Sequence, residues 1–192
     1  MTVVALAGRR IDMAGAEPAR FPLNQVERVK HELFEFFGAV HPSALVCSAA
    51  CGADLLALEC AAELGIATTI VLPFNRTRFR ASSVVDRPGN WGPRFDKAMK
   101  RAAASGHIEL ISAQAKDDDE AYALVTTEIL DCAENVARHA PGQESNTQDN
   151  KLIAAVVWDG TSRGPTDLTE YFRVHALSRG FTVQEIITRA IP

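Results

Sequence analysis

The chain has 192 residues, of which 47% are hydrophobic and 23% are charged. This length favours one domain with a sizeable core, and no apolar run approaches the ~20 residues that would span a bilayer. The formal net charge of −4 argues against a nucleic-acid binder with a broad basic face.

The start of the chain and its cysteines indicate a cytoplasmic protein. In MTVVALAGRR the apolar part precedes the arginines, which is the reverse of a signal peptide. The cysteines form no CxxC pair, and no histidine near Cys47 and Cys51 completes a zinc site. We therefore expect no metal and, in a reducing compartment, four buried thiols: Cys47, Cys51, Cys60 and Cys132.

The first part of the chain alternates apolar strands with helical segments. We predict strand 2–8, helix 21–38, strand 44–48, helix 53–65 and strand 67–74. Both helical segments end at a glycine, as helices commonly do. This alternation is typical of a parallel sheet covered on both faces. We therefore predict an α/β fold with a three-layer, Rossmann-like, doubly wound and mainly parallel sheet in a single domain, 1–192.

The second part is less regular. Residues 75–93 show no clean period and predict a long irregular loop, which in a compact domain is uncommon unless it is functional or disordered. The acidic start Asp117–Asp119 suits the positive end of the longest helix, so we interpret it as solvated rather than metal-binding. The remaining predicted elements are helix 93–106, strand 107–112, helix 117–140, a polar loop at 141–150, strand 151–160, helix 165–180 and strand 181–187.

The carboxyl ends of the predicted strands carry most of the candidate binding residues. Ligands of open α/β sheets bind at this edge, where the crossover direction changes. After the first three strands come Gly8, Arg9, Arg10, Asp12, Ser48, Gly52, Asp54, Asn75, Arg76, Arg78 and Arg80. After strand 151–160 come Asp159, Gly160, Thr161, Ser162, Arg163, Gly164 and Thr166.

Arginine is concentrated at this edge although the protein is acidic overall. Guanidinium groups bind phosphate in bidentate fashion and stay charged, and two of the glycine-containing loops precede helices whose free N–H groups favour an anion. The pattern predicts a phosphorylated small-molecule ligand. Ordinary surface arginines and simple turn glycines are the alternative interpretation. The arginines are Arg9, Arg10, Arg76, Arg78, Arg80 and Arg163.

Two acidic residues have alternative roles. A carboxylate at Asp54 would repel an anion in the first turn of its helix, so Asp54 either caps the turn or accepts hydrogen bonds from ligand hydroxyls. Glu170 lies one helical turn beyond Thr166 and is either a general acid/base or part of a solvated helix face. The dinucleotide motif G-x-G-x-x-G and the Walker A motif are absent, which disfavours NAD binding and ATP hydrolysis.

Three stretches resemble the SLOG superfamily, which unites DprA/Smf proteins, the LOG phosphoribohydrolases and the molybdenum-cofactor carrier proteins. They are ALAGRR, VCSAACGADLLALECAAELGIATTIVLPF and KLIAAVVWDGTSRGPTDLTEYFRVHALSRGFTVQEI. The resemblance covers most of the chain apart from residues 75–145. It implies a modified Rossmann fold that binds nucleotides or nucleotide-derived ligands, and a homodimer. It places two groups around the pocket: Gly8, Arg9, Ser48, Gly52 and Asp54; and Asp159, Gly160, Gly164, Thr166 and Asp167.

The sequence departs from the LOG enzymes at the catalytic positions. Those enzymes have PGGxGTxxE, and here Thr169 stands at the glutamate position while Glu170 lies about 100° further round the helix. We therefore expect a nucleotide-binding protein, as a sensor or carrier, that needs no other cofactor; a requirement for magnesium stays open.

Two alternatives to this function are kept. One is an N-glycosidic-bond hydrolase or transferase that uses Glu170 or Asp167, while Arg9 and Arg163 hold phosphate. It is kept because the last stretch also resembles nucleoside 2-deoxyribosyltransferases. The other is DprA-like binding of single-stranded DNA, which the acidic balance disfavours.

Overall fold

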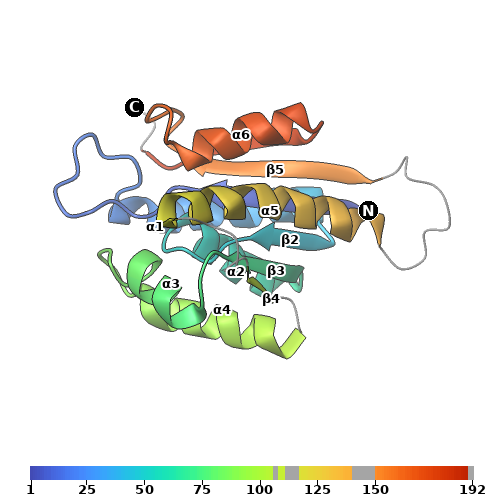
Figure 1. The fold of residues 1–192 in the computed structure, drawn as a ribbon, viewed down its shortest axis with the longest axis horizontal. Coiled ribbons are helices and arrows are strands. Elements are labelled where there is room, and N and C mark those ends of the chain that lie inside the picture. Colours follow the sequence, from blue (N-terminus) through green and yellow to red (C-terminus); the bar gives the residue numbers. More distant parts are fainter. Residues whose placement is uncertain (106–107, 111–116, 140–149, 190–192) are drawn as a thin grey trace.

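The computed structural model describes residues 1–105, 108–110, 117–139 and 150–189 (Figure 1). Its strands are β1 (Thr2–Gly8), β2 (Ala44–Cys47), β3 (Ala67–Leu72), β4 (Ile108–Leu110), β5 (Lys151–Trp158) and β6 (Thr182–Ile187). Its helices are α1 (Val26–Val40), α2 (Ala53–Leu64), α3 (Arg76–Ser83), α4 (Trp91–Ser105), α5 (Asp118–Arg138) and α6 (Leu168–Ser178), with a short 3₁₀ turn η1 (Leu23–Gln25) before α1.

The described strands form one sheet in the order β4-β3-β2-β1-β5-β6, and every neighbouring pair is parallel. The chain builds outward from β1 to β4, and α5 then lies across the sheet before β5 pairs with the free side of β1 (Figure 1). The crossover direction therefore reverses between β1 and β5. In open α/β sheets this reversal leaves a crevice beyond the carboxyl ends of the strands.

Helices cover both faces of the sheet. On one face, residues of α1, α2 and α4 pack against Val4 and Leu6 of β1. On the other face, residues of α5 and α6 pack against Val3 and Ala5 of the same strand. Successive side chains of a strand point to opposite faces, so a strand between two cores is apolar along its length. The predicted three-layer, Rossmann-like, doubly wound α/β fold in a single domain is confirmed, and the sheet is parallel throughout.

The predicted irregular loop at 75–93 was wrong for most of its length. Asn75 caps α3, because its side-chain oxygen accepts a hydrogen bond from the backbone N–H of Arg78, and the helix continues to Ser83. Helix α4 begins at Trp91, so the irregular connection is short. Helix α3 escaped detection because the residues that it buries are only Phe79 and Ser83, too few to produce an apolar period.

Some element ends also differ from the prediction. The first helix continues past Gly38 to Val40, and the left-handed residue that ends it is His41, with φ of 47°. The helix predicted at 165–180 begins at Leu168, after its cap Asp167. The predicted strand 107–112 is described only over β4, and residues 141–149 of the predicted polar loop lie outside the described residues.

All four cysteines are buried and unpaired, as expected. Asp117 caps α5 by accepting from the backbone N–H of Glu120, and Asp118 and Asp119 occupy the first turn. Within the described parts of the chain, no helix is both long and apolar enough to cross a membrane.

Gly8 provides a test of the packing at the end of β1. A Cβ at this position would lie 2.4 Å from the Cβ of Ala53 and 2.6 Å from the carbonyl oxygen of Val157. We expect Gly8→Ala to lower the free energy of unfolding by about 1–3 kcal/mol, because β1 and α2 cannot both keep their places. Urea unfolding followed by circular dichroism measures the change.

The matched control is Gly38→Ala, in an exposed part of α1 where an added Cβ meets nothing within 4 Å. This change should raise the free energy of unfolding by about 0.5–1 kcal/mol, because alanine loses less entropy in a helix. A Gly8→Ala protein as stable as the wild type would contradict the close packing described here.

Candidate functional site

A cavity of about 420 Å³ opens at the carboxyl end of the sheet, where β1 and β2 end. Its walls come from the segment after β1, the turn after β2, α3 with the segment that follows it, the first half of α5, and the start of α6. This volume falls in the range of about 300–1,000 Å³ found for small-molecule sites. The cavity lies beside the β1–β5 reversal, as the topology predicts.

The cavity brings together part of the predicted set. The backbone of the turn after β2 packs against the segment after β1, since the N–H of Ala53 donates to the carbonyl oxygen of Arg9 at 3.2 Å. Gly52 has φ of 96°, and a Cβ there would lie 2.8 Å from that oxygen, so this glycine permits the close approach without lining the cavity. The predicted binding residues that line it are Gly8, Arg9, Arg10, Ser48, Asp54 and Arg163.

Arg9 is buried in a network of ion pairs, with 4% of its side chain exposed. Its Nε donates to Asp159 at 3.0 Å, and its two terminal nitrogens donate to the two oxygens of Asp167 at 2.6 and 2.7 Å. One terminal nitrogen also donates to the carbonyl oxygen of Thr161 at 2.8 Å. The Arg9 guanidinium is thus held by the protein itself, and it ties the end of β1 to the β5–α6 connection.

Asp167 is held as a carboxylate by this network. It caps α6 by accepting from the backbone N–H groups of Thr169 and Glu170, and it also accepts from the N–H of Arg163. Burial by itself would raise the pKa of Asp167, but the hydrogen bonds from Arg9 and from the Arg163 backbone outweigh it and lower that pKa to about 2. At neutral pH this carboxylate therefore has little tendency to accept a proton.

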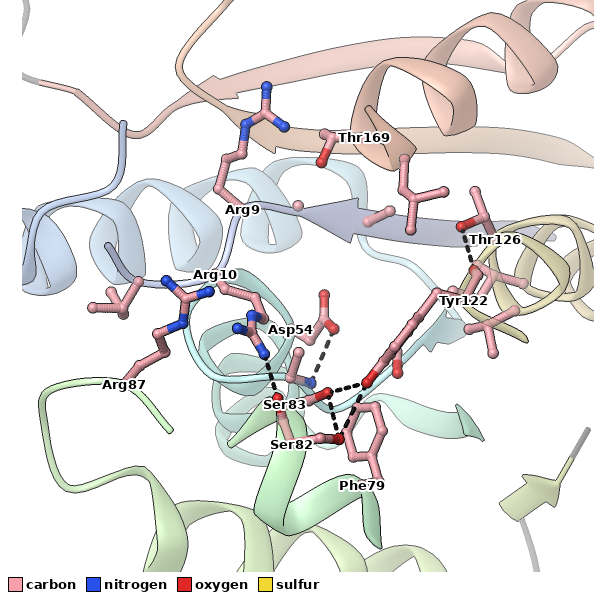
Figure 2. Close-up of a pocket in the computed structure, with 18 of the residues that line it drawn as sticks. Arg9, Arg10, Asp54, Phe79, Ser82, Ser83, Arg87, Tyr122, Thr126 and Thr169 are labelled. Carbon is pink, nitrogen blue, oxygen red and sulfur yellow. Dashed lines mark hydrogen bonds between the residues drawn. The ribbon is translucent and has the colours of Figure 1, made fainter. Parts of the chain in front are cut away.

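A second arginine cluster lies at another side of the cavity (Figure 2). Arg10 contacts Asp86 at 2.8 Å and donates to the carbonyl oxygen of Ser82 at 2.8 Å. Arg87 contacts the same carboxylate at 3.3 Å. Two guanidinium groups thus share one acidic partner at the cavity, and about a quarter of each side chain is exposed.

Asp54 lies in the cavity between Arg10 and Tyr122 (Figure 2). It is 6% exposed, and its Oδ2 accepts a hydrogen bond from the backbone N–H of Ala50 at 3.1 Å. Burial raises the pKa of Asp54 to about 7, although the Ala50 hydrogen bond and the charge of Arg10 oppose the shift. Asp54 therefore caps the turn before α2, which is one of the two roles predicted for it, while the N-cap position of α2 itself is Gly52.

The rest of the wall is apolar with a cluster of hydroxyl groups. The Tyr122 hydroxyl lies 2.8 Å from the hydroxyl of Ser83 and 3.2 Å from that of Ser82 (Figure 2). Apolar side chains complete this part of the lining: Ile11, Phe79, Val125, Ile129 and Leu168. Pockets for small molecules are commonly lined in this way, by apolar side chains with a few convergent polar groups.

The arginines of α3 lie outside the cavity lining. Arg76 and Arg80 both pair with Asp96 of α4 and lower its pKa. Arg78 pairs with Asp118 at 2.5 Å and its guanidinium lies 3.7 Å from the ring centre of Phe74. These three residues link α3 to neighbouring elements.

The loop between β5 and α6 reaches the cavity through Arg163, and Arg9 and Arg20 hold this loop in place by ion pairs. Arg20 contacts Asp159 at 2.7 Å and donates to the carbonyl oxygen of Thr161. Gly160, Gly164 and Thr166 are exposed and do not line the cavity. Glu170 also lies outside the lining, and both of its oxygens accept from Arg173 at 2.9 Å, which lowers its pKa.

The sequence interpretation missed several residues of the lining: Arg20, Ser82, Ser83, Arg87, Tyr122 and Thr126. Arg20 lies well beyond the residues that directly follow β1, so it was not counted among those at the strand end. Arg87 and the two serines lie in the segment that was predicted to be irregular. The signal for Tyr122 was available, because Tyr122, Val125, Thr126 and Ile129 share one face of a helix with a 3.6-residue period.

The search for relatives gives no family for the chain: neither models of known protein families nor curated protein sequences match it. The SLOG resemblance therefore stays a prediction from the three motifs, while the Rossmann-like parallel α/β fold is observed directly. Among the described residues, no group of three His, Cys, Asp or Glu side chains is placed to hold a metal ion.

Removing the Arg9 charge tests the buried network. Arg9→Gln leaves the carboxylates of Asp159 and Asp167 buried without their main partner, so we expect the free energy of unfolding to fall by about 3 kcal/mol or more. Arg173→Gln is the control, since it breaks a more exposed pair with Glu170 that contributes about 1 kcal/mol or less. Equal urea midpoints for the two variants would contradict this assignment.

Asp54→Asn tests the burial of that carboxyl group. A folded-state pKa of about 7, above the usual value of 3.8, means that the carboxyl group destabilises the fold as pH rises from about 4 to about 7. The amide carries no charge and can still accept from Ala50. We expect the variant to be more stable than the wild type at about pH 8, with a smaller difference at about pH 5. Urea unfolding at both pH values measures it, and a difference independent of pH would exclude the burial effect.

Proposed function

We propose that the cavity binds a nucleotide or a nucleotide-derived phosphorylated small molecule and that the protein acts as a sensor or carrier of this ligand. The observation that supports this most is the pair Arg10 and Arg87, which share the single carboxylate of Asp86 at the cavity. A phosphate group offers several oxygens in the geometry that guanidinium groups match, so it can engage both arginines at once.

The charge balance around the cavity favours an anion. Arg9, Arg20 and Arg163 face Asp159 and Asp167, which leaves one positive charge in excess. Arg10 and Arg87 pair with Asp86, which leaves a second positive charge in excess. Asp12 lines the cavity as well and removes one, so the sum is +1 when Asp54 is neutral. The local balance is thus opposite in sign to the protein's net charge of −4.

The rest of the cavity supports a ligand that also has an apolar or aromatic part. Beside the arginines lies the wall formed by Ile11, Phe79, Val125, Ile129 and Leu168, with the Tyr122 and serine hydroxyls available for hydrogen bonds. A small inorganic anion would use little of a volume of about 420 Å³. The SLOG resemblance of the turns after β1 and β2 points to the same ligand class.

Binding without hydrolysis is the function that we favour. The two carboxylates predicted to be catalytic in a glycosidic hydrolase, Asp167 and Glu170, do not line the cavity. Both are engaged by arginines. The single-stranded DNA alternative gains no support, because the arginines are grouped around a cavity and those of α3 are paired with acidic residues.

Isothermal titration calorimetry with adenosine monophosphate and with adenosine tests the proposal. We expect the nucleotide to bind and the nucleoside to bind at least about tenfold more weakly, since charge-assisted hydrogen bonds contribute about 1.5–3 kcal/mol each. Guanosine, cytidine and uridine monophosphates extend the series, because the base is not specified by the arginines.

Arg87→Gln and Arg163→Gln should each weaken nucleotide binding by about tenfold or more, whereas adenosine binding stays unchanged. The matched control is Arg138→Gln, which removes the same charge from an exposed position on α5. If nucleotide binding weakened equally in all three variants, the effect would come from the overall charge of the protein and not from the cavity arginines. Absence of binding by every nucleotide in the series at about millimolar concentration overturns the proposal.

A further inference from the structure

The carboxyl groups buried at this edge of the sheet differ in how they are neutralised. Asp54, Asp159 and Asp167 are 6%, 3% and 2% exposed. Asp159 and Asp167 both form ion pairs with Arg9. Asp54, in contrast, has no Lys, Arg or His nitrogen within 4.0 Å among the described residues. A charged carboxylate without a partner is strongly disfavoured in such a place.

The two oxygens of Asp54 have different environments. Oδ2 accepts from the N–H of Ala50, so it has the role of a carbonyl oxygen. For Oδ1, no hydrogen-bond partner exists within the described chain, and Asp54 itself lines the cavity (Figure 2). In the neutral acid the proton therefore belongs on Oδ1, where it is directed to the cavity.

The groups that act electrostatically on Asp54 are few. Arg10 lies on the segment after β1 and favours the charged form, but its guanidinium is already held by Asp86 and by the carbonyl oxygen of Ser82. The thiol of Cys47, at the end of β2, is buried and stays protonated because burial and the charge of Asp54 raise its pKa well above the usual value. Neither group supplies an ion pair.

We propose that Asp54 binds the ligand as a neutral acid and donates a hydrogen bond from Oδ1 to an acceptor atom of the anionic ligand, so that the anion and one proton bind together. This inference rests on the proposed function and adds the chemistry of recognition. An ionised Asp54 would cancel the excess charge of +1 around the cavity and would place a second anion beside the ligand. The neutral acid removes this repulsion and offers a donor.

The pH dependence that follows has a definite sign. Burial raises the pKa of Asp54 to about 7 in the free protein, and an anion in the same cavity raises it further. Near and above this pH the free protein has lost the proton that the complex keeps, so binding takes up a proton. The affinity therefore falls as pH rises above about 7, with a limit of about tenfold per pH unit.

Calorimetric titration of adenosine monophosphate into wild type and Asp54→Asn, from about pH 6 to about pH 9, tests the inference. The amide of asparagine is uncharged at every pH and donates from nitrogen. The phosphate of the probe ionises identically in both titrations, so the ratio of the two affinities isolates Asp54. We expect the wild-type affinity to fall relative to the variant by about tenfold or more across this range.

A second measurement does not depend on the folding of the variant. Titrations of the wild type at about pH 8, in two buffers with different heats of ionisation, should show uptake of about one proton per ligand after the phosphate contribution is subtracted. Circular dichroism establishes that Asp54→Asn is folded before it is compared.

The outcomes separate the two proposals. If both proteins bind the nucleotide with the same pH dependence and no proton is taken up, Asp54 is not the donor, although the binding function stands. If the wild-type affinity rises with pH relative to the variant, Asp54 is a carboxylate that accepts from ligand hydroxyls, and the inference is wrong. If neither protein binds any nucleotide, the proposed function itself fails.

Discussion

The site depends on the ion pairs of one buried arginine. Arg9 follows the central strand, and its guanidinium donates to Asp159 beyond β5 and to both oxygens of Asp167 at the start of α6. These contacts fix the β5–α6 connection next to the end of β1, beside the point where the crossover direction of the sheet reverses. Together with the Thr161 carbonyl oxygen, these partners engage most of the N–H donors of Arg9. The other arginines of the cavity wall have more capacity for a ligand: Arg10, Arg20, Arg87 and Arg163.

The arrangement separates two uses of charge. Where Arg9 is compensated by two carboxylates, it links the end of β1 to the β5–α6 connection. Where Arg10 and Arg87 share one carboxylate, the compensation is incomplete and the surplus faces the cavity. The position of an arginine at the carboxyl edge of the sheet therefore says little about its role until its acidic neighbours are known.

The strands of the fold were predictable from the sequence, but the ion pairs of the arginines were not. Strand β1 and strand β5 were recognisable because both faces are buried and their apolar runs are continuous. The parallel order then placed the turns after β1 and β2 together. The pairing of Arg9 could not be inferred, since its partner Asp159 lies 150 residues away and an isolated arginine shows no periodicity. Helix α3 was missed for a related reason: its arginines face other helices through ion pairs, so it lacks an apolar stripe.

The central position of β1 has a consequence for how the protein folds. Its register with β5 joins Thr2 to Lys151, and the Arg9–Asp159 pair spans nearly the same length of chain. During synthesis, at about 5–20 residues per second, the strands β1 to β3 are made well before β5, and one side of β1 stays open in the meantime. An unpaired central strand with a buried-type sequence is a template for other chains. The cavity and the protection of β1 against aggregation are therefore completed in the same late step.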